Sequence, residues 1–221
     1  MKAVFWDLDD TVLDTLAARM DALAHAHEVW VGRTVDPEEL WRSHAGHTLE
    51  DLGRKLVGDS YAAFCEAYRD HYYAANAEVR AFDGIPEVLQ DLSAHGLKHA
   101  IVTSKVSWGA TEELERIDLL RHFEAVVGFD DTESHKPDPA PVHAAMERLL
   151  IDHAADIVFV GDSPTDVAAA NGAGCVSVAA TWGTLDRESL VAERPDQIAA
   201  RPQDVAAIVG GLFAAASDED D

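Results

Sequence analysis

Four short segments of this chain carry residues that could do chemistry, and their order suits one reaction. The first two and the last follow apolar runs that are typical of buried strands, so their acidic and hydroxyl side chains would stand at strand ends. Carboxylates and a hydroxyl at strand ends, with a lysine between them in sequence, are what magnesium-assisted phosphoryl transfer to an aspartate requires. The segments are Asp7-Leu8-Asp9-Asp10-Thr11, Val102-Thr103-Ser104, Lys136-Pro137-Asp138-Pro139 and Gly161-Asp162-Ser163-Pro164-Thr165-Asp166.

Alternating strand-like and helical stretches, which resume after about residue 82, predict the elements that position these segments. Strands separated by helices of about 10–15 residues indicate an α/β fold with a Rossmann-like parallel sheet core and helices on both faces. Ligands of such sheets bind beyond the carboxyl ends of the strands, where Asp7, Asp9, Thr103 and Asp162 would converge. The expected strands are 2–8, 99–103, 124–129, 157–161, 175–179 and 197–199, and the expected helices are 85–94, 107–117, 139–150, 165–173 and a last one from about 204.

A separate unit, made only of helices, is predicted between the first strand and residue 82. Helical periodicity runs over 14–31, resumes after Asp36-Pro37 as N-cap and first helical residue, and continues over 48–57 and 60–75, with a break at 43–47. The sequence therefore predicts two domains, an α/β core domain of residues 1–14 and 82–221 and an inserted all-helical domain of residues 15–81.

The strongly acidic composition excludes some classes of binding partner. The net charge is −24 over 221 residues, and the lysines number only five, at positions 2, 55, 98, 105 and 136. Such a surface repels nucleic acid and anionic membranes, so neither is expected as a partner. Acid spread along the whole chain favours a halophilic protein adapted to a high-salt cytoplasm, with an ordinary acidic protein as the alternative.

The remaining sequence features favour a cytoplasmic protein. No apolar stretch reaches the roughly 18–20 residues that a membrane span needs. The N-terminus runs directly into a predicted strand, which leaves no room for a signal peptide. Cys65 and Cys175 match no metal-binding spacing and are expected to be buried. The oligomeric state, monomer or homodimer, stays open.

The four motifs in this order resemble the haloacid dehalogenase-like hydrolase superfamily. The pattern is Asp-x-Asp-x-Thr, then a hydrophobic strand ending in Thr/Ser, then Lys, then Gly-Asp-x-x-x-Asp. The helical insert directly after the first motif resembles the helical, C1-type cap domain of that superfamily. The resemblance covers residues 1–190 and implies a magnesium-dependent phosphatase acting on a small phosphorylated metabolite through an aspartyl-phosphate intermediate.

The resemblance implies roles for the first and last motifs. Asp7 is expected to be the nucleophile and a Mg²⁺ ligand, and Asp9 the general acid/base, with its backbone carbonyl as a second ligand. Asp162 is the expected third ligand. Thr11 is expected to support the orientation of Asp9. Asp10 stands where the superfamily more often has glycine and is interpreted as a tolerated structural variant.

The middle motifs would hold the phosphoryl group. The Thr103 hydroxyl and the Ser104 N–H are expected to bind the transferring phosphoryl oxygens. Lys136, on a loop made rigid by two prolines, would neutralise the nucleophile and the phosphoryl group. Asp166 is expected to orient metal-bound waters or Lys136. Lys105 either faces the anion or is a solvated surface lysine.

The cap is expected to select the substrate, for which phosphoglycolate is the best candidate. Related caps carry a substrate-contacting loop at the break near residue 46, so Arg42, His44 and His47 are candidate leaving-group contacts. Three stretches resemble phosphoglycolate phosphatases, namely Phe82-Asp83-Gly84-Ile85-Pro86, Lys136-Pro137 and Thr181-Trp182-Gly183.

Other activities on the same motifs stay open as alternatives. They are a sugar-phosphate mutase, a pyrophosphatase and, in a different class, a non-catalytic binding or regulatory module, which the intact motifs disfavour. Asp9 and Thr11 disfavour a dehalogenase. A phosphonate-cleaving relative would need a cap lysine that forms a Schiff base, and the single lysine of the insert, Lys55, is expected to be exposed.

Overall fold

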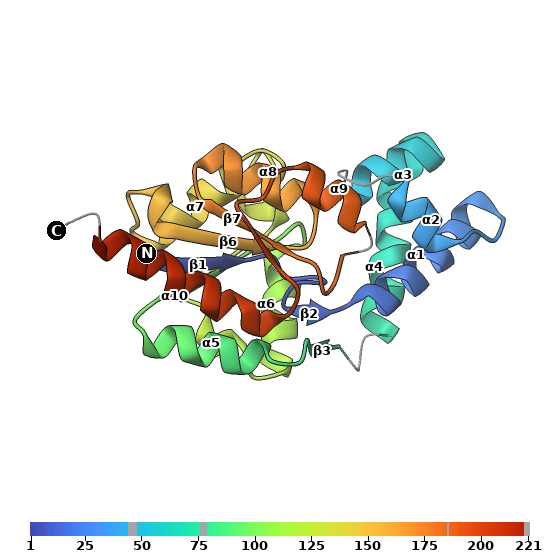
Figure 1. Ribbon diagram of the computed structural model, residues 1–221. Coiled ribbons are helices and arrows are strands. Elements are labelled where there is room, and N and C mark those ends of the chain that lie inside the picture. The colour runs from blue at the N-terminus through green and yellow to red at the C-terminus, as the bar shows by residue number, and fades with distance from the viewer. Residues whose placement is uncertain (44–47, 76–78, 185, 219–221) are drawn as a thin grey trace. The chain divides into compact units, whose positions relative to one another are not determined.

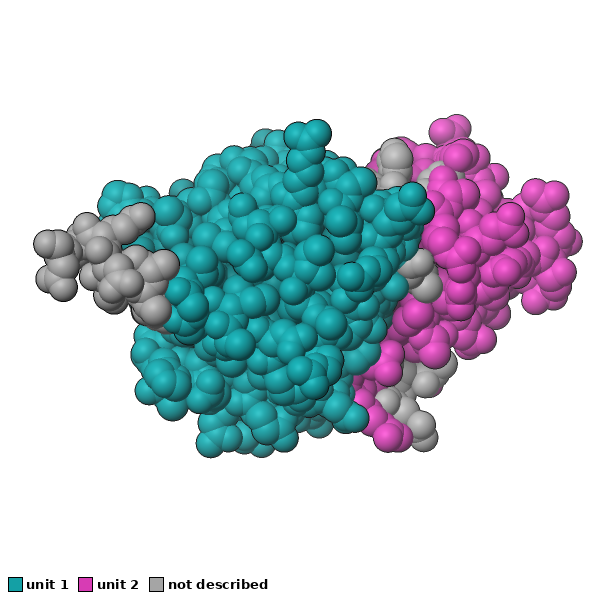
Figure 2. Space-filling model, in the orientation of Figure 1, with its two compact units in different colours: residues 1–13, 81–221 teal, residues 14–80 magenta. Residues whose placement is uncertain are grey.

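The structure is a computed structural model that describes residues 1–43, 48–75, 79–184 and 186–218. The chain divides into two compact units, coloured separately in Figure 2. The core unit comprises Met1–Leu13 and Ala81–Asp221, and the helical unit comprises Asp14–Arg80. The predicted domain boundaries, after residues 14 and 81, each lie one residue beyond these divisions.

The core unit is built on a six-stranded parallel sheet with the order β5-β4-β1-β6-β7-β8. β1 lies near the middle, and Trp6 at its end is in register with Ile101 of β4 on one side and Val160 of β6 on the other. The chain order reverses direction at β1, so the carboxyl ends of β1 and its neighbours form a topological switch point. The strands are β1 (Ala3–Trp6), β4 (Lys98–Val102), β5 (Ala125–Val127), β6 (Ile157–Gly161), β7 (Val176–Ala180) and β8 (Gln197–Ala199).

Helices cover both faces of this sheet, with α7 and α8 on one side and α5 and α10 on the other (Figure 1). The strands are apolar at nearly every position, as expected of strands that are buried on both faces. Ala3 and Phe5 of β1 pack in a buried cluster with Val142 of α7 and Ala169 of α8. The helices are α5 (Ile85–Ala94), α6 (Ser107–Arg116), α7 (Ala140–Leu149), α8 (Pro164–Ala173), α9 (Arg187–Ala192) and α10 (Pro202–Asp218).

The helical unit has its own small core of Leu23, Ala26, Leu52, Phe64 and Cys65. As predicted, Asp36 caps α2, and its side chain accepts from the backbone N–H groups of residues 38 and 39. The helices of this unit are α1 (Leu16–Val31), α2 (Pro37–Arg42), α3 (Leu49–Val57) and α4 (Tyr61–Ala75). Where the chain passes between the units, β2 (Leu13–Asp14) and β3 (Arg80–Ala81) form a two-stranded sheet.

The prediction of the fold class is confirmed, and the differences are local. The short elements β2, β3 and α9 are not among the predicted elements. The break expected at 43–47 falls mostly on residues outside the described part of the chain. Among the described residues, no helix combines the length and apolar character needed to cross a membrane.

Candidate active site

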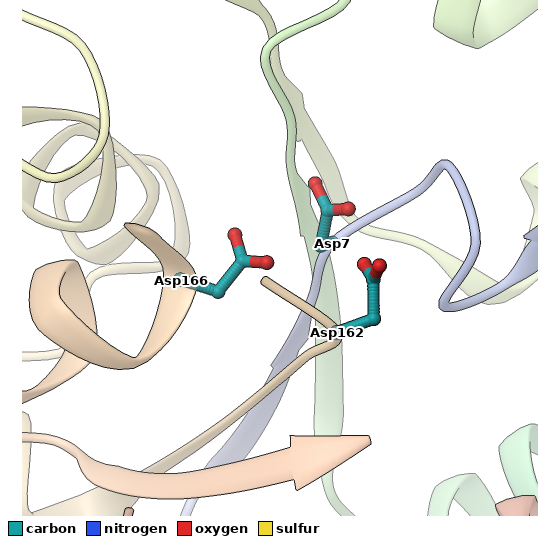
Figure 3. Close-up of side chains that lie close together, drawn as sticks. All are labelled: Asp7, Asp162 and Asp166. Carbon is teal, nitrogen blue, oxygen red and sulfur yellow. The ribbon is translucent and has the colours of Figure 1, made fainter. Parts of the chain in front are cut away.

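Three aspartates of the core unit bring carboxylate oxygens within 4.8 Å of one another. Figure 3 shows Asp7 directly after β1, Asp162 directly after β6 and Asp166 in the first turn of α8. β1 and β6 are hydrogen-bonded neighbours, so the sheet itself places Asp7 beside Asp162. The acidic cluster therefore stands at the carboxyl edge of the sheet, at its switch point.

Lys136 joins two of these carboxylates. Its ammonium group lies 2.6 Å from Asp7 Oδ1 and 2.5 Å from Asp166 Oδ1, and it donates a third hydrogen bond to the Val102 carbonyl at 3.0 Å. Lys136 is buried. Burial alone would lower the pKa of Lys136, but the carboxylates of Asp166 and Asp7 raise it above its ordinary value. The lysine is therefore held as a cation between the two acids.

Asp166 has both oxygens engaged by protein groups. Oδ1 accepts from Lys136, and Oδ2 accepts from the backbone N–H and hydroxyl of Ser163 at 3.0 and 2.6 Å. Ser163 in turn caps α8, which completes a capping box with Asp166. Gly161 permits this close packing, because a Cβ there would lie 2.3 Å from the Cβ of Asp166. These contacts favour Asp166 as the residue that orients Lys136.

The loop after β1 also contacts the segment that follows β7. Thr11 donates from its hydroxyl to Asp162 Oδ1 at 3.0 Å, and its carbonyl accepts from the Trp182 indole N–H, also at 3.0 Å. A Cβ on Gly183 would lie 1.7 Å from the Asp10 carbonyl oxygen, so only glycine fits there. Asp10 has a φ of 64°, a left-handed conformation that glycine, Asn and Asp adopt most readily, which explains why Asp is tolerated.

Thr103 and Ser104 follow β4, which is the other neighbour of β1. Thr103 is buried, and its hydroxyl oxygen accepts from the Lys105 backbone N–H at 3.1 Å. A hydroxyl that accepts one bond still has its own hydrogen to donate. Ser104 is exposed.

Asp9 belongs to a second ion cluster, which is largely shielded from solvent. Lys105 Nζ lies 2.8 Å from Asp9 Oδ1 and 2.5 Å from Glu113 Oε2. Lys105 is therefore not a solvated lysine, since its side chain is only 10% exposed. Glu113 was missed at the sequence level, although a signal was present. It stands on the buried stripe of α6 with Ala110 and Leu114, at the i+3 and i+4 spacing of a helix face.

The charged side chains of the two ion clusters carry an excess of negative charge, which a further cation would offset. The carboxylates of Asp7, Asp9, Glu113, Asp162 and Asp166 outnumber the ammonium groups of Lys105 and Lys136 by three. Burial raises the pKa of Asp7 to about 7, against the opposing effect of Lys136, so a further positive charge nearby would favour the ionised form of Asp7. Mg²⁺ prefers one or two carboxylates together with water, and the oxygen-only donor set of Asp7 and Asp162 fits it.

The cap residues proposed for substrate contact are only partly described. Arg42 is exposed at the end of α2 and pairs with Glu38 at 2.9 Å, one helical turn away. His44 and His47 lie outside the described residues. Lys55 is exposed on α3, as expected.

Residues 4–180 match the family described as haloacid dehalogenase-like hydrolases, and the chain belongs to that family. The family assignment made from the four motifs is thereby confirmed, and the protein is a hydrolase. The matched range contains every residue of the two ion clusters.

Individual relatives extend the similarity to nearly the whole chain. The chain is 35% identical over 197 residues to a candidate pyrophosphatase, PpaX, of Caldanaerobacter subterraneus subsp. tengcongensis, which covers 88% of each protein. It is 30% identical over 220 residues to the phosphoglycolate phosphatase of Yersinia pseudotuberculosis, covering 95% of this chain and 94% of that one. The crystal structure of a predicted phosphoglycolate phosphatase from Haemophilus somnus superposes with a TM-score of 0.84 over 95% of this chain and 98% of that chain, at 22% identity, and shares the fold.

Proposed function

We propose that this protein is a Mg²⁺-dependent phosphatase that hydrolyses a small phosphomonoester through an aspartyl-phosphate on Asp7. The observation that carries the proposal is the buried Lys136, which contacts both Asp7 and Asp166. Carboxylate oxygens of these two residues and of Asp162 lie within 4.8 Å of one another. A lysine held in this way fixes the carboxylate of Asp7 and reduces its repulsion of an approaching phosphoryl group.

In the first half of the reaction, an Asp7 oxygen forms a bond to phosphorus as the bond from phosphorus to the leaving-group oxygen breaks. Asp9 donates a proton to that oxygen, so that the product leaves as an alcohol. The Thr103 hydroxyl donates to a phosphoryl oxygen. Lys136 offsets the charge that gathers on the nucleophile and the phosphoryl group.

In the second half, water attacks the phosphorus of the aspartyl-phosphate. Asp9, left as a carboxylate, takes a proton from this water, and the bond between phosphorus and the Asp7 oxygen breaks to release phosphate. Asp9 is then protonated again and Asp7 is free, so the cycle closes without another reactant.

The site residues also provide for the metal ion. Asp7, Asp162 and the backbone carbonyl of Asp9 would hold Mg²⁺, whose charge would neutralise the phosphoryl oxygens during transfer. The charge excess of the two ion clusters supports this assignment, because a site that is already negative would otherwise repel a phosphate ester.

Phosphoglycolate is the proposed substrate, and pyrophosphate is the second candidate. Phosphoglycolate is supported by the name of the Yersinia relative at 30% identity, and pyrophosphate by the name of the relative at 35% identity. The helical unit is proposed to act as the cap, with Arg42, His44 and His47 as leaving-group contacts. The acidic composition supports activity in a high-salt cytoplasm.

Phosphate release from a panel of compounds tests this function. The panel contains phosphoglycolate, pyrophosphate, a sugar phosphate and p-nitrophenyl phosphate, each assayed in high KCl with Mg²⁺ or with EDTA. Asp7→Asn should lower release on the order of 10³-fold or more, because the nucleophile is lost. Asp91→Asn, which removes an exposed carboxylate of α5, is the matched control and should leave release unchanged.

The outcomes separate the candidates. Release that requires Mg²⁺ and disappears in Asp7→Asn supports the phosphatase, and the ranking of compounds decides between phosphoglycolate and pyrophosphate. Equal release by Asp7→Asn and wild type would refute the assignment of the nucleophile. Folded wild-type protein that releases phosphate from none of the compounds would instead favour a mutase or a binding module.

A further inference from the structure

We propose that Lys105 and Glu113 are positioning residues that hold the acid/base Asp9 in its working orientation. This inference rests on the proposed function, because it concerns the proton transfers assigned to Asp9. It extends that function to two residues outside the four motif roles, one of which, Glu113, lies on a helix with no motif.

The geometry is a chain in which one ammonium group lies between two carboxyl groups, all three largely withdrawn from solvent. Glu113 contacts Lys105 Nζ at 2.5 Å, and Nζ contacts Asp9 Oδ1 at 2.8 Å. Their side chains are 1%, 10% and 16% exposed in that order. Holding Oδ1 of Asp9 restricts the rotation of its carboxyl group, and therefore the directions in which Asp9 can deliver or accept a proton.

Stability alone does not account for the burial of Glu113. Taking an ammonium and two carboxylates out of water costs several kcal/mol per ion, and well-packed apolar side chains of similar volume often serve a fold as well or better. Glu113 occupies a stripe of α6 that otherwise holds Gly109, Ala110 and Leu114, where an apolar residue would suit the core. We therefore assign to the charge of Glu113 a role that an apolar residue could not perform.

Lys105 also connects the acid/base to the phosphate-binding hydroxyl. Its backbone N–H donates to Thr103 Oγ1 at 3.1 Å, while its side chain holds Asp9. One residue thus sets the positions of two groups that act on opposite ends of the bond that breaks. Glu113 of α6 contacts the Lys105 ammonium as well, so Glu113 and Asp9 together position it.

The inference predicts a dependence on the leaving group. An alkyl phosphate such as phosphoglycolate releases a strongly basic alkoxide unless a proton is supplied, whereas p-nitrophenyl phosphate releases a phenolate that is stable as an anion. The ratio kcat/KM reports the steps up to the transfer of the phosphoryl group to Asp7. A misplaced acid therefore lowers kcat/KM for the alkyl ester alone.

The experiment compares Lys105→Met and Glu113→Gln with wild type on the two esters. Lys105→Met should lower kcat/KM for the alkyl phosphate by roughly 10- to 100-fold and that for the aryl phosphate by less than about threefold. Glu113→Gln should also lower kcat/KM for the alkyl phosphate more than for the aryl phosphate, but by a smaller factor. The double variant should match Lys105→Met, because Glu113 acts through Lys105. kcat should fall for both esters, since Asp9 also activates the water that they share.

Controls keep the test independent of folding and of the proposed function. Glu112→Gln makes the same change at the exposed neighbouring position of α6 and should match wild type on both esters. The double variant removes the charges of Lys105 and Glu113 together. It therefore remains informative if Lys105→Met alone impairs folding by leaving the charge of Glu113 without its partner. Asp7→Asn should lose both activities, and its failure to do so would count against the phosphatase rather than against the positioning pair.

Two results would overturn the inference. An equal fall of kcat/KM for both esters would make the pair a structural feature. A rise in KM for both esters with kcat unchanged would assign Lys105 to phosphate binding instead.

Discussion

Removal of the Lys136 ammonium should destabilise the core unit more than the removal of any exposed charge. Lys136→Met keeps most of the volume of the side chain and deletes its charge. Asp7 and Asp166 are then left buried beside each other without the cation that both of them contact, at 2.6 and 2.5 Å. A buried carboxylate that loses its partner keeps the full cost of its desolvation.

The structure sets the size of the effect. At an effective dielectric constant of about 20, the attraction across the 2.6 Å contact of Lys136 with Asp7 is about 6 kcal/mol, and the contact with Asp166 is similar. Burial of the ammonium offsets much of this gain, and breaking buried pairs typically costs about 3–5 kcal/mol. We therefore expect Lys136→Met to lower the free energy of unfolding by about 3–5 kcal/mol at neutral pH.

Urea unfolding followed by tryptophan fluorescence measures this loss, with EDTA present and KCl held constant. Lys2→Met is the control, because Lys2 forms a largely exposed ion pair with Asp156 at 3.0 Å and should contribute less than about 1 kcal/mol. Adding Asp7→Asn to Lys136→Met should recover part of the loss, since it removes one of the two buried carboxyl groups that lose their cation.

The charge argument would be refuted by either of two results. One is a loss for Lys136→Met no larger than that for Lys2→Met. The other is a double variant less stable than Lys136→Met, which would mean that packing, and not the unpaired carboxylates, dominates at this position.

Two further predictions follow from single positions. Gly183→Ala should lower activity at least about tenfold, because its Cβ would lie 1.7 Å from the Asp10 carbonyl oxygen and displace the loop that carries Asp7, the proposed nucleophile. A Cβ on Gly211 would have nothing within 4 Å, so Gly211→Ala should match wild type, and equal activities of the two variants would contradict this reasoning. Burial lowers the pKa of His99, whose Nδ1 accepts from the Trp6 indole, from 6.5 to about 4. The unfolded chain therefore binds a proton that the folded protein does not, and the contribution of His99 to stability should fall by about 3 kcal/mol as the pH drops from about 6.5 to 4. Urea unfolding across this range should show a smaller loss for His99→Gln, and parallel curves would argue against a buried neutral His99.

Much of the fold follows from local pattern. The apolar runs of β1, β4 and β6 and the helices between them lie within one or two residues of the predicted ranges, because strands buried on both faces and amphipathic helices leave clear periodic signatures. The sequence of α9 shows no such periodic signature, since its six residues make less than two turns. The order of the strands is not a local property, and it is the order that places β1 between β4 and β6.

The candidate site shows the same division. The sequence predicted the candidate acids, the hydroxyl and Lys136, because their types and spacing form contiguous motifs whose order resembles one family. Only the tertiary structure decided that both oxygens of Asp166 bind protein groups, that Lys105 contacts Asp9 and that Glu113 lies behind it. These contacts span up to 96 positions in the chain, and a charged residue reveals its partner only after folding has removed it from water.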